Sequence, residues 1–499
     1  MPSPYILAID QGTTSTRALV FDDTGQCLGS FQKEFSQYYP RPGWVEHDLE
    51  EIWQSVVAVV PAALQAAGVD GRQLAAIGLT NQRETVALWE RGTSKPLARA
   101  IVWQDRRTSD YCRQRLADEP WLFERTGLVL DPYFSAPKMR WLLDQDPAWE
   151  TAAHAGQLAF GTIDAFLIHR LSGGQVHRTD TTNASRTLLM DLHRLSWDEE
   201  LCRYFGVPRA VLPDITPSSG DFGVTAGLDF LPDGVPITGV LGDQQAALAG
   251  QGGFTVGAAK CTYGTGAFLL RHIGAEVKSS RHRLVTTVAP MLDAQPQYAL
   301  EGSVFVAGAA VQWLRDGLRL LANAADSETL AARSDPDQPL VFVPGFVGLG
   351  APHWLPEARG VLFGLTRGTT AAELARAALE GVAHQVADLV VAADADAPVP
   401  LHELRVDGGM TANAWFLQRQ ADLLGLPVVP SANPEATALG AALMAGWRVG
   451  LWTSTEQLHR LTPSGQTYVP KFSDETRRRQ RHQWHNAVHA VKVFYGQQE

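Results

Sequence analysis

Residues 5–22 read YILAIDQGTTSTRALVFD. Two apolar runs, YILAID and RALVFD, are joined by a segment of small polar residues, QGTTST. Short apolar runs bounded by turn residues are typical of buried strands. Strand-like and helix-like segments alternate along the chain. This alternation predicts an α/β fold.

Two helix starts carry a capping pattern. In the first, Asp48-Leu49-Glu50-Glu51 precedes residues 52–64, whose apolar positions recur with a helical period. In the second, Thr370 is followed three residues later by Glu373 and then by the apolar segment LARAALEGVAHQVADLVVAA. We expect a helix to begin at each of these places.

The opening pattern returns about half a chain later. Residues 260–274, KCTYGTGAFLLRHIG, repeat an approach to a Gly-Thr turn, followed by an apolar strand that ends near a glycine. A repeat at this offset indicates a duplicated architecture of two domains. We place the domains at residues 1–250 and 251–499, with the glycines of residues 250–253 suited to a hinge.

Composition narrows the function classes. With 499 residues the chain has room for two to four domains, and 45% hydrophobic and 19% charged residues are ordinary globular values. The net charge of −11 argues against a nucleic-acid or anionic-membrane surface. The four cysteines, Cys27, Cys112, Cys202 and Cys261, have no metal-ligand spacing, and we expect reduced thiols. With no basic-apolar leader pattern and no run of 18 apolar residues, we expect a cytoplasmic protein with no integral membrane segment.

Three Gly/Thr-rich turns are candidates for binding phosphate. They lie at residues 10–17, 263–266 and 407–409, while the motifs GxxxxGK[ST] and GxGxxG are absent. Glycine lets backbone N–H groups approach an anion, threonine adds hydroxyl donors, and Arg17 adds charge. Each turn taken alone is more often an ordinary hairpin or Asx turn.

A polar interruption divides one predicted strand. Residues 78–89 read GLTNQRETVALW, with Arg83 and Glu84 side by side between apolar runs. Locally, this pair is most simply a surface ion pair worth about 0–1 kcal/mol. The alternative is a ligand clamp, in which arginine offers a fork of donors and glutamate offers acceptors. Neighbouring side chains of a strand point to opposite faces, so joint contact requires the strand to bend or end there.

One aspartate follows the apolar strand PITGVLG directly. Asp243 either caps the helix that begins at QQAALAG or projects from the strand end as a proton acceptor. The residues by themselves favour neither interpretation.

A dozen motifs in register resemble the FGGY carbohydrate kinase family over nearly the whole chain. They are DQGTTSTRA (10–18), PGWVEHD (42–48), NQRET (81–85), VWQDRRT (102–108), DPYFSA (131–136), TNASRT (182–187), GDQQAAL (242–248), YGTG (263–266), GLGAPHW (348–354), FGLTRG (363–368), RVDGG (405–409) and ATALGAA (436–442). The resemblance implies two actin-like (ribonuclease H-like) domains with a nucleotide and substrate cleft between them. It also implies transfer of the γ-phosphoryl group of ATP, with Mg²⁺, to a terminal hydroxyl of glycerol, giving sn-glycerol 3-phosphate and ADP. A homo-oligomer, dimer or tetramer, is implied as well.

The resemblance also implies roles for particular residues. Asp243 would be the general base, and Asp10 would help to place Mg²⁺, directly or through water, with Asp243 as a second ligand. The glycerol contacts implied are Arg83, Glu84, Trp103, Tyr133, Asp243, Gln244 and Phe268. The nucleotide contacts implied are Thr13, Thr14, Ser15, Arg17, Thr265, Gly308, Gln312, Gly409 and Asn413.

Two rival functions are compatible with a similar fold. One is an FGGY kinase that acts on a larger polyol or ketose, against which NQRET and DPYFS argue because those segments match the triol clamp. The other is an actin-like ATPase module of a chaperone or filament protein, which would bind nucleotide without a small acceptor.

Overall fold

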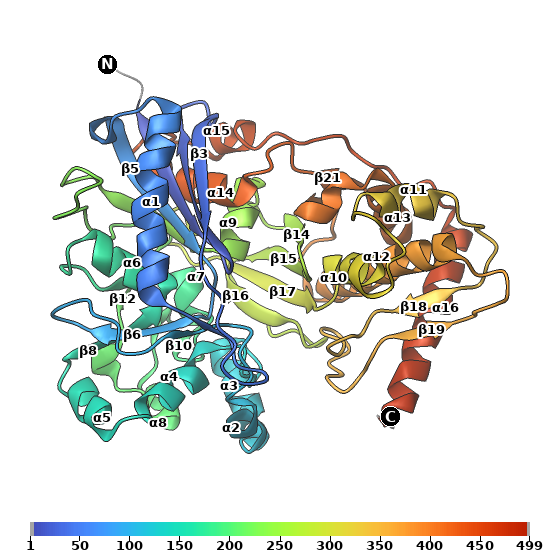
Figure 1. Ribbon diagram of the computed structural model, residues 1–499, viewed down its shortest axis with the longest axis horizontal. Coiled ribbons are helices and arrows are strands. Elements are labelled where there is room, and N and C mark those ends of the chain that lie inside the picture. Colours follow the sequence, from blue (N-terminus) through green and yellow to red (C-terminus); the bar gives the residue numbers. More distant parts are fainter. Residues whose placement is uncertain (1–3, 497–499) are drawn as a thin grey trace.

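The protein forms two lobes, each built around a β-sheet (Figure 1). The structure is a computed structural model that describes residues 4–496. We call the lobe that holds the N-terminal strands the first lobe and the one that holds helix α12 the second lobe. Strands β14–β17 and helix α9 lie between the bulk of the two lobes in Figure 1.

The first lobe is organised by a five-stranded sheet in the order β13-β5-β1-β2-β3. Its strands are β1 (Tyr5–Gln11), β2 (Ser15–Phe21), β3 (Cys27–Glu34), β5 (Leu74–Asn81) and β13 (Ile237–Gly242). Strands β1 and β2 form an antiparallel hairpin, whereas β5 pairs parallel with both β1 and β13. The carboxyl ends of β1, β5 and β13 therefore lie side by side.

Both faces of this sheet are covered, which explains the continuous apolar runs. Leu7 and Ile9 face helices α1 (Leu49–Ala67) and α6 (Ile163–Leu171). Ile6 and Ala8, on the opposite face, pack against helix α14 (Ala436–Arg448). Helix α14 comes from the C-terminal half of the chain, so that half contributes directly to the core of the first lobe.

Helix α14 approaches its neighbours very closely because glycines line the contact. A Cβ added at Gly440 would lie 1.9 Å from the backbone oxygen of Ala246 in helix α9 (Asp243–Gly250). A Cβ at Gly250 would lie 1.7 Å from the oxygen of Ala436. These glycines allow two helix backbones to touch, so Gly250 has a packing role whether or not it is also a hinge. The boundary at residue 250 stays a prediction.

The second lobe is built on a six-stranded sheet in the order β16-β17-β15-β14-β20-β21. Its strands are β14 (Ala259–Tyr263), β15 (Ala267–Gly274), β16 (Val285–Val288), β17 (Tyr298–Val304), β20 (Leu404–Asp407) and β21 (Val428–Pro430). Helices α12 (Ala371–Asp396) and α13 (Ala414–Leu424) pack on it to form the largest apolar core.

The internal repeat predicted from the sequence is confirmed as two equivalent hairpins. Strands β14 and β15 are antiparallel, like β1 and β2, and β14 pairs parallel with β20 as β1 does with β5. Each Gly-Thr turn thus connects the two strands of a hairpin whose first strand has a parallel neighbour.

The two predicted helix starts are both present, but one cap differs from the prediction. Thr370 and Glu373 form the complete reciprocal capping box of α12. Asp48 caps α1 through the N–H groups of Glu50 and Glu51. The Glu51 carboxylate does not complete that box; it accepts hydrogen bonds from Ser36 N and Tyr38 Oη instead. A neighbouring segment thus offers this side chain better donors than the helix end does.

The remaining elements complete the two lobes. A four-stranded sheet contains β4 (Glu46–His47), β7 (Ala100–Ile101), β6 (Val86–Glu90) and β8 (Leu158–Thr162), and smaller pairs are β9 (Arg178–Asp180) with β12 (Asp214–Thr216), β10 (Met190–Asp191) with β11 (Ser196–Trp197), and β18 (Val341–Val343) with β19 (Val361–Phe363). The other helices are α2 (Ser109–Arg113), α3 (Glu119–Thr126), α4 (Ser135–Leu143), α5 (Pro147–His154), α7 (Thr181–Ala184), α8 (Glu199–Phe205), α10 (Gly308–Gln312), α11 (Asp326–Ala332), α15 (Thr455–Arg460) and α16 (Asp474–Phe494).

Two expectations concern the whole chain. The four cysteines are free of disulfides, as predicted. Within residues 4–496, none of the helices combines the length and the apolar character needed to cross a membrane.

The contact between α9 and α14 predicts that replacing a helix glycine by alanine destabilises the protein, which is the opposite of the usual effect. In a helix interior, Gly→Ala normally stabilises by about 1 kcal/mol. Because a Cβ at Gly440 would lie 1.9 Å from a backbone oxygen, we expect Gly440→Ala to lower the free energy of unfolding instead, by about 1–3 kcal/mol, the usual cost of overpacking. Urea unfolding measures the change.

Gly92→Ala is the matched control, because nothing lies within 4 Å of a Cβ at Gly92. Equal stability of Gly440→Ala and the wild type would contradict the proposed backbone contact.

Candidate active site

Three parallel strands of the first sheet end at one edge. Asn81 at the end of β5 lies opposite Gln11 of β1 and Gly242 of β13. The residues that follow these ends, Gly12, Gln82 and Asp243, therefore emerge together. In open α/β sheets this carboxyl edge is where ligands bind.

The polar interruption in GLTNQRETVALW is the place where a strand ends. Strand β5 stops at Asn81 and β6 starts at Val86. In the bend, Glu84 has a positive φ of 59°, and the Thr85 N–H donates to Arg83 O at 2.7 Å. A left-handed non-glycine residue costs about 1–3 kcal/mol and is often found at functional sites. The bend frees Arg83 and Glu84 from strand alternation, as the clamp interpretation requires.

Arg83 and Glu84 are buried, so the interpretation as a surface ion pair is wrong. Arg83 is 3% exposed and Glu84 is 1% exposed. Their own contact is loose, with 3.8 Å between Arg83 Nε and Glu84 Oε1. Each side chain instead has a closer partner of opposite charge from another element.

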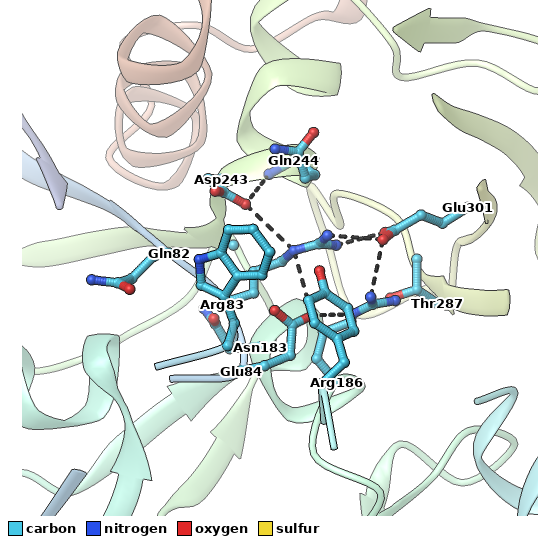
Figure 2. A network of polar contacts seen from close by, with 12 residues as sticks. Gln82, Arg83, Glu84, Asn183, Arg186, Asp243, Gln244, Thr287 and Glu301 are labelled. Carbon is cyan, nitrogen blue, oxygen red and sulfur yellow. Dashed lines mark hydrogen bonds and ion pairs between the residues drawn. The ribbon is translucent and has the colours of Figure 1, made fainter. Parts of the chain in front are cut away.

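Those partners are Glu301 on β17 and Arg186, which follows α7 (Figure 2). Arg83 donates from Nη1 and Nη2 to the two carboxylate oxygens of Glu301 at 2.6 and 2.8 Å. Arg186 donates from Nε to Glu84 Oε1 at 2.6 Å and from Nη2 to Glu301 Oε1 at 2.9 Å. We call these four residues the charge ring. Because Glu301 belongs to the second sheet, the ring connects the two lobes.

Arg83 and Glu301 of the charge ring stay ionised although they are buried. Burial alone would lower the pKa of Arg83, but Glu301 and Glu84 raise it well above its usual value. Burial alone would raise the pKa of Glu301, but Arg186 and Arg83 outweigh this and lower it to about 2.

Asp243 lies beside the charge ring at the start of α9. Its Oδ1 is 3.4 Å from Arg83 Nε, and its side chain is 32% exposed. The residue before it, Gly242, occupies the N-cap position, and the Asp243 carboxylate accepts from the N–H of the adjacent Gln244 at 2.7 Å. The alternative N-cap interpretation of Asp243 therefore does not describe this helix.

The surroundings of Asp243 change its acidity. Burial raises the pKa of Asp243 to about 6, the Arg83 charge opposes this rise, and the carboxylates of Glu84 and Asp10 add to it. A pKa of about 6 still leaves Asp243 mostly ionised at pH 7.

An aromatic group adjoins the polar residues. The Trp103 ring centroid lies 5.8 Å from that of Tyr133 and 6.4 Å from that of Phe268, both in edge-on geometry. The Trp103 indole N–H donates to the Thr13 hydroxyl at 3.0 Å. The aromatic residues predicted for the substrate site are therefore brought together, and one of them contacts the Gly/Thr-rich turn of residues 10–17.

The Gly/Thr-rich turn of residues 10–17 is tightly closed. The Gly12 N–H donates to Ser15 O at 2.9 Å, while Thr14 between them is exposed. Arg17 pairs with Asp10 and with Glu435, each at 2.5 Å. Two carboxylates thus share the Arg17 guanidinium, and Glu435 comes from the segment just before α14.

The predicted nucleotide residues of the second lobe gather around the equivalent turn. Gly308 N–H donates to Gly264 O at 2.9 Å, next to Thr265, and a Cβ at Gly308 would lie 2.7 Å from that oxygen. Gly409 follows β20, the parallel neighbour of β14, and open space surrounds its Cβ position. Gln312 is exposed at the end of α10.

Asn413 has a structural use that the sequence did not suggest. Its side-chain oxygen caps α13 by accepting from Phe416 N at 2.8 Å, and its Nδ2 lies 3.3 Å from Ser327 Oγ.

Sequence reasoning missed Glu301, Arg186 and Lys260. Arg186 lies within one of the family motifs, TNASRT, and Glu301 is a lone charge within the apolar strand YALEGSV, which is a usable signal. Lys260 is fully buried on β14 and donates from Nζ to Gln244 Oε1 and to Thr262 Oγ1. It thereby orients Gln244, a predicted substrate residue.

The carboxylates at the site fit a metal that needs few protein ligands. Asp10 lies one residue before the end of β1 and Asp243 directly follows β13, so the two carboxylates stand at the same edge of the sheet. Among residues 4–496 no cluster of three or more His, Cys, Asp or Glu side chains could hold a metal ion. Mg²⁺ keeps several waters and takes one or two carboxylates, so this pair suits it better than a metal that needs a full protein cage.

Comparison with known families agrees with this geometry. Residues 5–250 match the model of the N-terminal domain of the FGGY family of carbohydrate kinases, and residues 259–449 match that of its C-terminal domain. The chain belongs to the FGGY family of carbohydrate kinases.

Individual relatives are similar to this chain over almost its whole length. It is 51% identical over 494 residues to a glycerol kinase of Bordetella parapertussis, covering 98% of this chain and 97% of the relative. A crystal structure of Plasmodium falciparum glycerol kinase with ADP is 36% identical, covers 98% of both chains and has a TM-score of 0.92. A xylulose kinase of Lactobacillus acidophilus, at 21% identity and a TM-score of 0.88, shares the fold. The predicted α/β fold of two actin-like domains is confirmed.

The charge ring predicts how stability depends on pH. In the folded protein, Arg186 and Arg83 hold the pKa of Glu301 at about 2, below its usual value of 4.5. The resulting stabilisation is fully present above pH 4.5 and is lost as the pH falls from there toward 2. We expect Glu301→Gln to lower the free energy of unfolding by about 3–5 kcal/mol at pH 7, the cost of breaking a buried pair.

Urea unfolding of both proteins from pH 7 down to the lowest pH at which both fold measures this difference. The gap between the two should narrow as the pH falls. Glu403→Gln, which removes a carboxylate that is 45% exposed, is the control and should show no such gap. A gap that widens with acid would contradict the ionised state of Glu301.

Proposed function

We propose that this chain phosphorylates glycerol at a terminal hydroxyl, using ATP and releasing sn-glycerol 3-phosphate and ADP. The observation that carries the proposal is the juxtaposition of the Arg83–Glu84 bend with the Asp243 carboxylate, 3.4 Å from Arg83 Nε. High identity to a glycerol kinase over almost the entire chain supports the same substrate.

The polar groups match a small triol. Arg83 retains N–H donors beyond those bound by Glu301, and Glu84 retains an acceptor oxygen. We propose Tyr133, Asp243 and Gln244 as the other polar contacts, and Trp103 and Phe268 as the apolar wall against the C–H groups of glycerol. This mixture of forked donors, acceptors and aromatic surface is what three hydroxyls on a short carbon chain require.

Asp243 is the proposed general base. At pH 7 its carboxylate is mostly ionised, since its pKa is about 6. It accepts the proton of the attacking hydroxyl as the oxygen–phosphorus bond forms and the bond between the γ-phosphorus and the β,γ-bridging oxygen breaks. The electron pair of that bond leaves with ADP. A base whose pKa lies near the working pH is well matched to this task.

The two hairpin turns are the proposed phosphate contacts. Thr13, Thr14, Ser15 and Arg17 would bind from the first lobe and Thr265 from the second, with Gly308, Gln312, Gly409 and Asn413 around the rest of the nucleotide. Arg17 has five N–H donors, so its pairs with Asp10 and Glu435 leave others for phosphate oxygens. The Plasmodium falciparum relative was crystallised with ADP, which supports a nucleotide site in this family member.

Asp10 and Asp243 would hold Mg²⁺, directly or through water. When bound, the ion would offset the negative charge that develops on the phosphate oxygens during transfer. We further propose a cytoplasmic homo-oligomer, dimer or tetramer; light scattering on the purified protein tests the oligomeric state.

The first test is an assay of purified protein with ATP, Mg²⁺ and either glycerol, erythritol, xylulose or gluconate. We expect the largest kcat/KM for glycerol. A clear preference for xylulose would support the rival pentulose kinase, and ATP hydrolysis unaffected by any acceptor would support an ATPase module.

Asp243→Asn tests the base. Because general-base catalysis contributes about 10²–10⁴-fold, we expect kcat to fall by at least about 100-fold while glycerol binding remains measurable by calorimetry. The control is Asp221→Asn, at a carboxylate that is 70% exposed. Normal turnover by Asp243→Asn would exclude the base role.

The pH dependence of kcat/KM for glycerol is a separate test. Protonated Asp243 cannot accept the hydroxyl proton, so activity should fall as the pH drops below about 6, approaching tenfold per pH unit. Initial rates between pH 5 and 8 measure this limb. A flat profile over that range would contradict the assignment.

A further inference from the structure

The Arg83 guanidinium is only partly used by the protein. Of its five N–H donors, Nη1 gives two, to Glu301 Oε2 at 2.6 Å and Gln245 Oε1 at 3.2 Å, and Nη2 gives one, to Glu301 Oε1 at 2.8 Å. The Nε–H and the second Nη2–H remain. In the planar guanidinium these two point the same way along one edge, as a second fork. That edge lies toward Asp243, 3.4 Å from Nε.

Glu84 is used in the same partial way. Its Oε1 accepts from Arg186 Nε at 2.6 Å, whereas its Oε2 has no hydrogen-bond partner among residues 4–496. Each member of the Arg83–Glu84 pair is therefore held from one side by a partner of opposite charge and left open on the other. The two partners are themselves paired, with Arg186 Nη2 2.9 Å from Glu301 Oε1.

We propose that Glu301 and Arg186 are the positioning pair of the substrate clamp. Resting on the proposed function, this assigns them no contact with substrate: they hold Arg83 and Glu84 so that one donor fork and one acceptor oxygen face glycerol. Since Glu301 stands on β17, the second lobe sets the orientation of a clamp that belongs to the first. The orientation of the Arg83 guanidinium then depends on the relative position of the two lobes.

Two physical arguments favour positioning over mere stability. Buried ion pairs are weak stabilisers, and well-packed apolar replacements are often as stable or more so. In addition, the Arg83 stem is guided independently: a Cβ at Gly242 would lie 2.6 Å from both its Cγ and its Cδ. Gly242 leaves room for the side-chain carbons of Arg83, and the Glu301 carboxylate binds the donor fork that points away from Asp243. Together they allow the guanidinium few orientations.

The test compares Glu301→Gln, Glu301→Asp and Arg186→Lys with the wild type. We expect KM for glycerol to rise about 10- to 100-fold in each, the range seen when outer partners are removed from metal ligands, with little change in KM for ATP. Because kcat should change less than KM for glycerol, the split between these two constants is a readout that loss of stability alone would not produce.

Asp388→Asn is the matched control for destabilisation. Asp388 of α12 is also a buried carboxylate with several charged or polar partners: Arg481 and Trp484 lie on α16, and His353 lies in the segment between β18 and β19. We expect this variant to lose stability without any change in KM for glycerol.

The outcomes separate the two proposals. No glycerol phosphorylation by the wild type would contradict the proposed function. An active wild type with an unchanged KM for glycerol in Glu301→Gln, or equal rises in KM for glycerol and ATP, would overturn only the positioning role. Failure of all three ring variants to fold, while Asp388→Asn folds, would show the ring to be structural and would overturn it too.

Discussion

The constraint on which the site depends is the bidentate ion pair between Arg83 and Glu301, buried between two sheets. Two charges this far from water keep their ionisation only because each has partners of opposite sign at hydrogen-bond distance, which is why Arg186 and Glu84 complete a ring. The charge ring lies between the end of β5 and strand β17. The two lobes therefore contact each other through ion pairs as well as through apolar side chains. Directional contacts of this kind fix the orientation of a planar guanidinium, which apolar packing does not.

A second constraint acts on the backbone. Gly250 and Gly440 let α9 and α14 touch, and α9 begins with Asp243 and Gln244. Helix α14 also covers one face of the first sheet. A segment from the C-terminal half of the chain thus holds the helix that carries the proposed base, next to the sheet whose strand ends carry the proposed clamp. Asp243 Oδ1 lies only 3.4 Å from Arg83 Nε because the first sheet, α9 and α14 form one packed unit.

Much of the fold could be predicted from local pattern. The hairpins β1–β2 and β14–β15, the helix starts at Asp48 and Thr370, and the end of β5 at the polar interruption all follow from apolar period and turn residues, which act over a few neighbours in sequence. The resemblance to the FGGY family then indicated the site residues. Partners could not be predicted in this way. Glu51 accepts hydrogen bonds from Ser36 and Tyr38 rather than from the end of its own helix. Arg83 pairs with Glu301, which is 218 positions away in the sequence.

The sequence by itself therefore determined the two-domain α/β architecture, the family and the place of the proposed clamp, because periodicity, turns and motifs depend on neighbouring residues. Only the tertiary structure decided what the Arg83–Glu84 pair is. Its burial, the left-handed Glu84 and the partners Glu301 and Arg186 arise when β17 and α7 are brought against the end of β5. An ion pair that is weak in water becomes a directional constraint once solvent is excluded, and solvent exclusion is a property of the packed chain.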